Sequence, residues 1–206
     1  MKPTEGLLIA LEGLDFSGKN TQQRLLDEWL CKKGYQVLST REPGGTPLGE
    51  EIRRLLLLKK HVICAKAELL LFMASRAEFV RDILIPELSQ GKIVITSRYF
   101  FSSLAYQGYA RELSIPSLLQ ITDFVIEGLV PDLTILIDLE VDKVFIRRGG
   151  NQVDRIEEEG RAFFERARNG FLELSKDRRW NVRVVDGDDS VENIHSRIIA
   201  LIQGLL

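Results

Sequence analysis

Residues 7–21 of the chain read LLIALEGLDFSGKNT. The apolar run Leu7–Leu11 is typical of a buried strand, and a helical pattern begins at Thr21. The glycines between them allow successive backbone N–H groups to point into one concavity, the helix start adds partial positive charge, and Lys19 can neutralise phosphate oxygens. This strand–loop–helix order predicts a phosphate-binding loop. Its residues are Gly13, Asp15, Phe16, Ser17, Gly18, Lys19, Asn20 and Thr21.

Apolar runs and helical patterns alternate along the rest of the chain. Further strands are predicted at Gln36–Thr40, Ile93–Thr96, Leu133–Asp138 and Val182–Asp186. Helices are predicted at Thr21–Lys33, Leu48–Leu58, Lys66–Gln90 with a break near Pro86, Ser114–Gly128, Val141–Arg148, Arg161–Lys176 and Val191–Leu206. This alternation predicts an α/β fold with a parallel five-stranded sheet and helices on both faces. Ligands of such sheets lie beyond the carboxyl ends of the strands.

Composition narrows the class of protein. With 206 residues, 45% hydrophobic and 28% charged, the chain has an ordinary globular composition and is expected to form one domain over residues 1–206. The formal net charge of -2 argues against a general polyanion binder, so no nucleic-acid partner is expected. The longest apolar runs are too short to cross a bilayer. Two cysteines without metal-ligand spacing, and no leader pattern in Met1–Glu5, predict a cytoplasmic protein.

Further motifs follow the ends of the other predicted elements. These are REPGGT at 41–46, LLFMASR at 70–76, RY at 98–99, AYQG at 105–108, PDLT at 131–134 and DRIE at 154–157. Together and in this order they resemble the bacterial thymidylate kinases, whereas the phosphate loop alone indicates only a nucleotide-binding protein. The resemblance implies a three-layer P-loop NTP hydrolase-type fold with a short lid over about residues 149–160.

The resemblance also implies a reaction. A nucleoside-monophosphate kinase of this family transfers the γ-phosphoryl group of ATP to dTMP with Mg²⁺ as cofactor, and gives dTDP and ADP in dTTP biosynthesis. The implied partners are the small molecules ATP and dTMP, without a membrane partner, and a second copy of the chain in a homodimer. Two alternatives stay open: a catalytically weakened paralogue that binds dTMP and ATP, and a kinase for another pyrimidine monophosphate.

In the implied acceptor pocket, two arginines at strand ends hold the phosphate of dTMP. These are Arg41 and Arg98, and Arg53 assists them. A guanidinium suits this role because its planar fork matches two phosphate oxygens at once. Glu42 and Pro43 shape the turn beside the phosphate. An acceptor held in this way already carries a phosphate, which makes an uncharged nucleoside a poor fit.

The base side of the implied pocket comes from two segments. Phe72 stacks on the thymine ring, and Arg76, one helical turn further on, donates to an exocyclic oxygen. Ser103 and Gln107 hydrogen-bond the base edge, and Tyr106 lies against the deoxyribose and excludes a ribose 2′-hydroxyl. Phe72 has a second interpretation as plain core, because its neighbours in the sequence are apolar.

Phosphoryl transfer requires positive charge near the transferring group, which a closing lid can supply while it excludes water. The family carries this arginine just before the variable stretch of the lid, where this chain has Gly150, or a basic residue in the phosphate loop, where it has Phe16. Arg148 or Arg155 must therefore substitute, unless that arginine only pairs with a nearby glutamate. Asp15 is the expected positioning carboxylate. The predicted catalytic residues are Asp15, Lys19, Arg98, Arg148 and Arg155.

Two further departures from the family concern the metal side. Asn20 replaces the hydroxyl residue that usually ligates Mg²⁺ after the lysine, and Ser97 replaces an aspartate before the Arg-Tyr pair. An amide oxygen can also ligate a hard cation. The predicted metal-side residues are Asn20, Ser97 and Asp15, which act mostly through substrate phosphates and water. Either metal handling is rearranged or turnover is slow, and the second case is the weakened paralogue.

Overall fold

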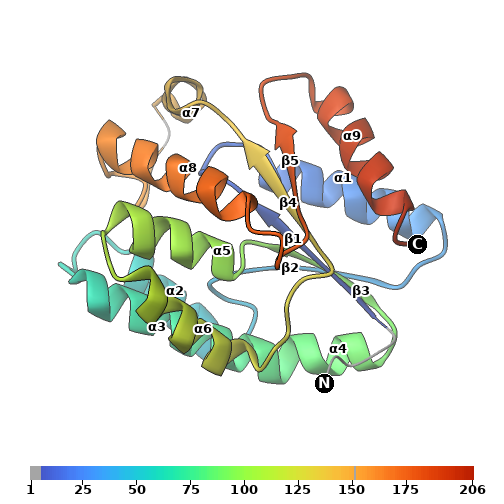
Figure 1. Cartoon of the computed structure of the whole chain (residues 1–206), viewed down its shortest axis with the longest axis horizontal. Helices are drawn as coiled ribbons and strands as arrows, with labels where there is room; N and C mark the ends of the chain where they lie inside the picture. Colours follow the sequence, from blue (N-terminus) through green and yellow to red (C-terminus); the bar gives the residue numbers. More distant parts are fainter. Residues whose placement is uncertain (1–5, 151) are drawn as a thin grey trace.

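The chain folds around a parallel sheet (Figure 1) in a computed structural model that describes residues 6–150 and 152–206. Residues Met1–Glu5, where no leader is expected, and Asn151 of the predicted lid lie outside the described residues. The strands are β1 Leu7–Glu12, β2 Val37–Arg41, β3 Ile93–Ser97, β4 Leu133–Asp138 and β5 Val182–Asp186. They lie in the order β2-β3-β1-β4-β5. The predicted parallel five-stranded sheet is confirmed.

The register of the sheet brings three strand ends into one row. Leu11 of β1 pairs with Ser97 of β3, and Ser97 pairs in turn with Arg41 of β2. The loops that follow, with Gly13 after β1 and Arg98 after β3, therefore begin at the same edge of the sheet. This edge is the carboxyl end of the parallel strands, where ligands of such sheets bind.

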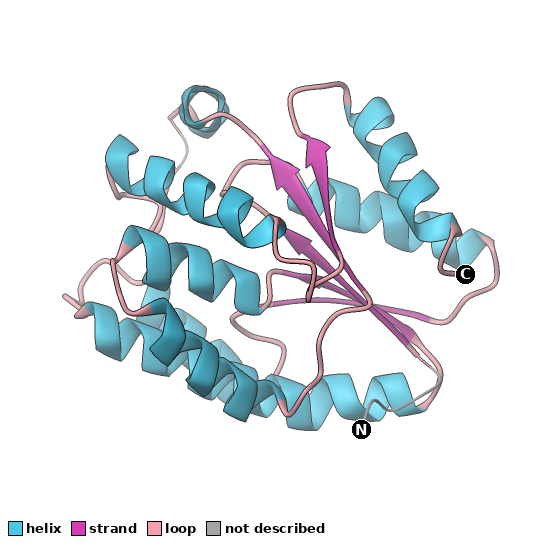
Figure 2. Cartoon of the chain, in the orientation of Figure 1, coloured by secondary structure: helices cyan, strands magenta, loops and turns pink. Residues whose placement is uncertain are grey.

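Helices cover both faces of the sheet (Figure 2). They are α1 Lys19–Lys32, α2 Pro47–Leu57, α3 Ala65–Phe79, α4 Ile85–Ser89, α5 Phe100–Ser103, α6 Ile115–Ile126, α7 Val141–Arg148, α8 Arg161–Ser175 and α9 Val191–Gln203. On β1, Ile9 and Leu11 pack in the core shared with α1 and α9, while Leu8 and Ala10 pack in the core of the opposite face. Burial of both faces confirms the predicted three-layer architecture. Within the described ranges, no helix is long and apolar enough to cross a membrane.

Two segments have π-helical hydrogen bonding, η1 Val80–Leu84 and η2 Leu104–Ala110. The sequence predicts a break near Pro86, and this prediction is wrong, because the helical chain continues from α3 through η1 into α4. Pro86 lies in the first turn of α4. A wide turn before the proline accommodates its missing N–H group without ending the helical path.

The helical segment Phe100–Ala110, made of α5 and η2, has no counterpart in the sequence prediction. Nearly all of its side chains are buried, so no exposed polar face gives the segment a helical period. The segment matters for function because it follows the end of β3 and carries Ser103, Tyr106 and Gln107. Those side chains therefore come to the carboxyl edge of the sheet from a helix.

Candidate active site

A cavity of about 480 Å³ opens at the carboxyl edge of the sheet. It is lined by the phosphate loop, the ends of β2 and β3, parts of α2, α3, α5, η2 and α7, and residues after α7. The predicted site residues that line it are Asp15, Phe16, Gly18, Lys19, Asn20, Thr21, Arg41, Glu42, Pro43, Arg53, Phe72, Arg76, Ser97, Arg98, Ser103, Tyr106 and Gln107. Segments far apart in the sequence thus meet around one cavity.

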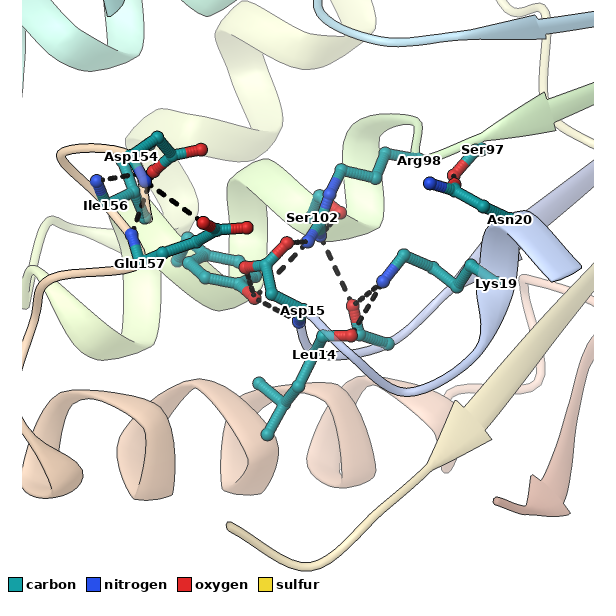
Figure 3. A network of polar contacts seen from close by, with 12 residues as sticks. Leu14, Asp15, Lys19, Asn20, Ser97, Arg98, Ser102, Asp154, Ile156 and Glu157 are labelled. Atoms are coloured by element: carbon teal, nitrogen blue, oxygen red, sulfur yellow. Dashed lines mark hydrogen bonds and ion pairs between the residues drawn. The ribbon is translucent and has the colours of Figure 1, made fainter. Parts of the chain in front are cut away.

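The phosphate loop connects β1 to α1 with two glycines at positive φ. Gly13 has a φ of 134°, and a Cβ there would lie 2.4 Å from a carbonyl oxygen of β4, so a side chain is excluded. Gly18 has a φ of 102° and caps α1. The Nζ of Lys19 donates to the carbonyl oxygens of Gly13 at 3.0 Å and Leu14 at 2.6 Å (Figure 3). Burial, reinforced by the nearby charge of Arg98, lowers the pKa of Lys19 to about 7.

Arg98 lies at the centre of a polar network between the phosphate loop and the acceptor side (Figure 3). Its Nη2 pairs with Oδ1 of Asp15, and its Nη1 donates to Oγ of Ser102 at 2.9 Å. The hydroxyl of Tyr106 donates to Oδ2 of Asp15 at 2.9 Å. Burial alone would raise the pKa of Asp15, but the nearby charges of Arg98 and Lys19 outweigh burial and bring the pKa below its ordinary value. The carboxyl therefore stays ionised.

Glu12, the last residue of β1, is a site residue that the sequence pattern did not reveal. It is fully buried, and its Oε1 accepts from the backbone N–H groups of Tyr99 at 2.7 Å and Ser102 at 3.2 Å. Burial raises its pKa above the ordinary value. These bonds hold the turn at Arg98, whose φ of 72° is uncommon for a residue with a side chain. The only signal in the sequence was a carboxylate at the end of an apolar strand.

A buried ion pair borders the acceptor side of the cavity. Arg76 is 1% exposed, and its Nη2 lies 2.6 Å from Oε2 of Glu42. The same nitrogen donates to the carbonyl oxygen of Tyr99 at 3.1 Å. Burial raises the pKa of Glu42 to about 7 against the opposing charge of Arg76. Phe72 lines the cavity and also packs against the core, so its position fits both of its interpretations.

Some buried polar atoms beside the cavity have no hydrogen-bond partner in the described part of the chain. They include Oγ of Ser103 and Oε1 of Glu42, and both residues line the cavity. Oγ of Ser17 in the phosphate loop is a further example. A buried polar atom without a partner carries a desolvation penalty, which a hydrogen bond to a ligand relieves. The acceptor side is therefore suited to a polar ligand.

Arg41 and Arg53 approach the cavity from β2 and α2. Arg41 is half-exposed, and its Nη2 lies 3.3 Å from a carboxylate oxygen of Glu50. The Nη1 of Arg53 donates to the carbonyl oxygen of Pro43 at 3.0 Å. Arg54 instead pairs with Glu51 on the exposed side of α2 and is absent from the lining residues. Neighbouring arginines on one helix thus have different surroundings.

The arginines predicted to act from the lid lie away from the cavity lining. Arg155 donates through Nη2 to Glu68 at 2.6 Å and through Nε to the carbonyl oxygen of Leu56 at 2.8 Å. The guanidinium of Arg148 lies 5.5 Å from the ring centroid of Phe145. Neither arginine is among the described residues that line the cavity. Their catalytic role stays a prediction, and it requires a different position of the side chain.

Three charged residues near the lid line the cavity without having been predicted as site residues: Arg147, Asp154 and Glu157. The Nη1 of Arg147 donates to the carbonyl oxygen of Ser17 at 3.4 Å, which places this guanidinium against the phosphate loop. Oδ1 of Asp154 accepts from the backbone N–H of Glu157 at 2.9 Å (Figure 3). Burial raises the pKa of both carboxyl groups. Arg147 stands next to Arg148 in the sequence, and only the helix orientation distinguishes them.

The predicted metal-side residues Asn20 and Ser97 contact each other (Figure 3). Oγ of Ser97 donates to Oδ1 of Asn20 at 3.2 Å, and both side chains line the cavity. Asp15 is already paired with Arg98. No group of three or more His, Cys, Asp or Glu side chains forms a metal site in the part of the chain that the structure describes. This neutral oxygen donor set fits a hard cation that brings phosphate and water ligands with it.

Comparison with known proteins places this geometry in a family. The model of the thymidylate kinase family matches residues 11–198. The chain belongs to the thymidylate kinase family. It is 45% identical over 205 residues to the thymidylate kinase of Halothermothrix orenii, with 98% of each chain covered. It is 44% identical over 195 residues to that of Kosmotoga olearia, covering 94% of this chain and 93% of the relative.

The fold of the thymidylate kinase family also accounts for the architecture. The crystal structure of thymidylate kinase from Ehrlichia chaffeensis superposes with a TM-score of 0.80 at 35% sequence identity, and covers 96% of this chain and 98% of that one. The predicted P-loop α/β fold and the resemblance on which it was based are confirmed. Membership of the thymidylate kinases also confirms the predicted enzyme class, a nucleoside-monophosphate kinase, which is a transferase.

Proposed function

We propose that the chain transfers the γ-phosphoryl group of ATP to dTMP with Mg²⁺ as cofactor, and forms dTDP and ADP in dTTP biosynthesis. The observation that carries this proposal is a cavity that joins the phosphate loop to an acceptor side whose buried polar atoms include some without a partner among the described residues. The thymidylate kinases of Halothermothrix orenii and Kosmotoga olearia support dTMP as the acceptor.

On the donor side, the phosphate loop binds the phosphates of ATP. Its backbone N–H groups and the start of α1 attract negative charge. Lys19 exchanges its hydrogen bonds with the loop carbonyls for bonds to phosphate oxygens. Arg147 already lies against the loop, and its positive charge can offset the negative charge that develops on the oxygens of the transferring group. Arg148 and Arg155 remain the candidates for this role after a movement of the lid.

On the acceptor side, Arg98, Arg41 and Arg53 hold the phosphate of dTMP. Arg98 occupies the boundary with the phosphate loop, so the acceptor phosphate that it binds lies next to the transferring group. Asp15 accepts hydrogen bonds from Arg98 and Tyr106 and keeps both side chains in place. Alignment of the two phosphates is the main requirement of the reaction, because the transition state is stabilised largely by position and charge.

Mg²⁺ bound to ATP neutralises the developing phosphoryl charge in such reactions. In this chain Asn20 and Ser97 would hold it through their side-chain oxygens, together with phosphate and water ligands. Their hydrogen bond is the observation that favours the second candidate function, a weakened paralogue, because neither oxygen carries charge. A kinase for another pyrimidine monophosphate is the third candidate. The contacts that the pocket makes with the edge of the base distinguish this candidate from a kinase for dTMP.

The reaction is tested by a coupled assay of ADP formation with dTMP, with and without Mg²⁺. We expect ADP formation to require both, and dTDP to accumulate in equal amount. Tight binding of dTMP without dTDP at any Mg²⁺ or Mn²⁺ concentration contradicts the proposal and favours the paralogue. The double variant Ser97→Asp with Asn20→Ser separates the two further: a large gain in rate indicates a weakened enzyme, and little change an active one.

We also propose that the protein is a cytoplasmic homodimer whose other partners are small molecules alone. Exposed apolar side chains on α2, α3 and α6 support a second copy as partner. These are Leu55, Leu70 and Phe124, which are 43%, 54% and 82% exposed. Light scattering at micromolar concentration tests the dimer, and a monomeric mass contradicts it.

A further inference from the structure

A buried carboxylate outside the assigned site joins three parts of the molecule. Glu68 lies in the first turn of α3 and is 0% exposed. Its Oε1 accepts from Nε2 of Gln107 in η2 at 2.9 Å and from Nε of Arg111 at 3.2 Å. Its Oε2 accepts from Nη2 of Arg155 in the lid segment at 2.6 Å. An acidic residue in the first turn of a helix is ordinary, so nothing in the sequence pattern distinguishes Glu68.

Glu68 is ionised at neutral pH. Burial alone would raise its pKa, but the hydrogen bonds from Gln107, Arg111 and Arg155 outweigh burial and hold the pKa below the ordinary value. An ionised carboxylate has no hydrogen to donate. Only the NH₂ end of the Gln107 amide can therefore face Glu68, and this fixes the orientation of that amide.

The fixed orientation leaves the amide oxygen of Gln107 for a ligand. Gln107 is 1% exposed and lines the cavity, and of its side-chain atoms only Nε2 has a hydrogen-bond partner in the described part of the chain. Arg76, which lines the same cavity, can only donate. The pocket thus presents an acceptor at Gln107 and a donor at Arg76.

This pattern distinguishes the two kinds of pyrimidine. A base with a ring N–H and an exocyclic oxygen, such as thymine or uracil, offers a donor to Gln107 and an acceptor to Arg76. Cytosine offers a ring-nitrogen lone pair and an amino group, so each contact sets like against like and leaves buried polar groups unpaired.

We propose that Glu68 is a positioning residue for base selection, which favours pyrimidines with a ring N–H by holding the amide oxygen of Gln107 toward the ligand. The inference rests on the proposed function, because it concerns the acceptor pocket of that same site. Glu68, which lies outside the cavity lining, would thus control whether the pocket prefers dTMP or dCMP as acceptor.

The test is calorimetric binding of dTMP and dCMP to the full-length chain and to Glu68→Gln. A neutral glutamine at position 68 can donate as well as accept, so the amide of Gln107 is free to turn over. We expect the ratio of the dCMP Kd to the dTMP Kd to fall at least about tenfold, which corresponds to one lost discriminating hydrogen bond. A merely structural loss would weaken both ligands and leave the ratio unchanged.

Two variants control the test. Glu159→Gln removes the other carboxylate that pairs with Arg111 and does not contact Gln107, so it should keep the wild-type ratio. Glu68→Asp keeps an acceptor-only carboxylate and should retain the ratio within about threefold. If Glu68→Gln does not fold, the double variant Glu68→Gln with Arg111→Leu, which also removes one of the two arginine charges that face position 68, carries the same measurement.

The outcomes separate this inference from the proposed function. An unchanged ratio in folded Glu68→Gln, or the same loss of ratio in Glu159→Gln, overturns the role of Glu68 and leaves dTMP as acceptor. Failure of the wild-type chain to bind dTMP overturns the proposed function itself and the inference with it. A ratio that falls only in Glu68→Gln and is retained in Glu68→Asp supports both.

Discussion

The acceptor side and the donor side of the cavity are built from different interactions. On the acceptor side, Arg76 pairs with the buried carboxylate of Glu42, and Arg98 pairs with the partly buried carboxylate of Asp15. On the donor side, Lys19 bonds to carbonyl oxygens of its own loop, and Asn20 and Ser97 form a hydrogen bond between neutral groups. One side therefore holds paired charges, and the other holds backbone dipoles and two cations, Lys19 and Arg147, that bond to carbonyl oxygens of the loop.

This difference separates stability from catalysis. A buried ion pair that loses one partner leaves an uncompensated charge, so acceptor-side substitutions should destabilise the fold as well as weaken the reaction. Donor-side groups face the position of the negatively charged phosphates of a nucleotide. Their loss should therefore weaken nucleotide binding and lower the rate more than it destabilises the fold. Substitutions on each side test this division.

The largest effect is expected for Arg76→Met. The substitution leaves Glu42 buried without its cation, and we expect the free energy of unfolding to fall by roughly 3–5 kcal/mol. Urea unfolding followed by circular dichroism measures it. Arg54→Met, which breaks an exposed pair with Glu51 on α2, is the control and should change stability by less than about 0.5 kcal/mol. Equal losses in both variants would mean that the buried pair has no special role.

A somewhat smaller effect is expected for Arg98→Ala on activity. The variant loses the guanidinium between the two phosphates, and we expect kcat/KM for dTMP to fall roughly 10²–10³-fold. The donor-side variant Arg147→Ala should raise the KM for ATP by roughly tenfold and change the unfolding midpoint little. Steady-state kinetics with each substrate varied in turn gives both values. An Arg98→Ala enzyme with normal kcat/KM for dTMP shows that the acceptor phosphate binds elsewhere.

Much of this fold could be predicted because its determining features are local. Each strand is a short apolar run, and burial on both faces makes those runs continuous rather than alternating. The phosphate loop follows from glycines, lysine and a helix start within one segment, 7–21. Phe100–Ala110 could not be predicted as a helix because burial on all sides removes its polar face.

Site residues could be predicted from the sequence only where the residue type and its position beside a predicted element together indicate a role. Arg41 and Arg98 stand at strand ends, where an arginine is conspicuous. Glu12 and Glu68 act through buried hydrogen bonds to segments more than thirty residues away, and no spacing in the sequence indicates such contacts. Which of Arg147 and Arg148 lines the cavity depends on which face of α7 is turned toward it. Two adjacent arginines in a sequence do not indicate that orientation.

A moderate effect is expected for Arg53→Ala. Its guanidinium lines the cavity beside Pro43 and can reach the acceptor phosphate, so we expect the KM for dTMP to rise roughly tenfold with kcat changed less than threefold. Arg54→Ala, one position further on the same helix, should leave both constants unchanged. Should Arg54→Ala match Arg53→Ala, the effect would come from the general charge of α2 rather than from a contact in the pocket.

The smallest expected effect concerns the proton of Lys19. Its pKa of about 7 lies well below the ordinary 10.5, so at pH 8 most molecules hold a neutral amine. A nucleotide phosphate beside the amine favours the charged form and raises this pKa. Binding of ADP at pH 8 should therefore take up close to one proton. Calorimetry in buffers that differ in ionisation enthalpy measures this uptake, which should decrease as the pH falls below 7.

Lys19→Arg separates the titration of this residue from its charge. Arginine stays charged at pH 8, so ADP binding to the variant should proceed without proton uptake, even if its affinity is lower. Lys176→Met, which removes an exposed lysine paired with Glu173, should retain the wild-type uptake. If Lys19→Arg takes up the same number of protons as the wild type, the proton binds to another group. The donor side would then not gain its positive charge at Lys19 when the nucleotide binds. Loss of uptake in Lys19→Arg alone would show that this lysine becomes charged only when the phosphates arrive, in contrast to the arginines of the acceptor side.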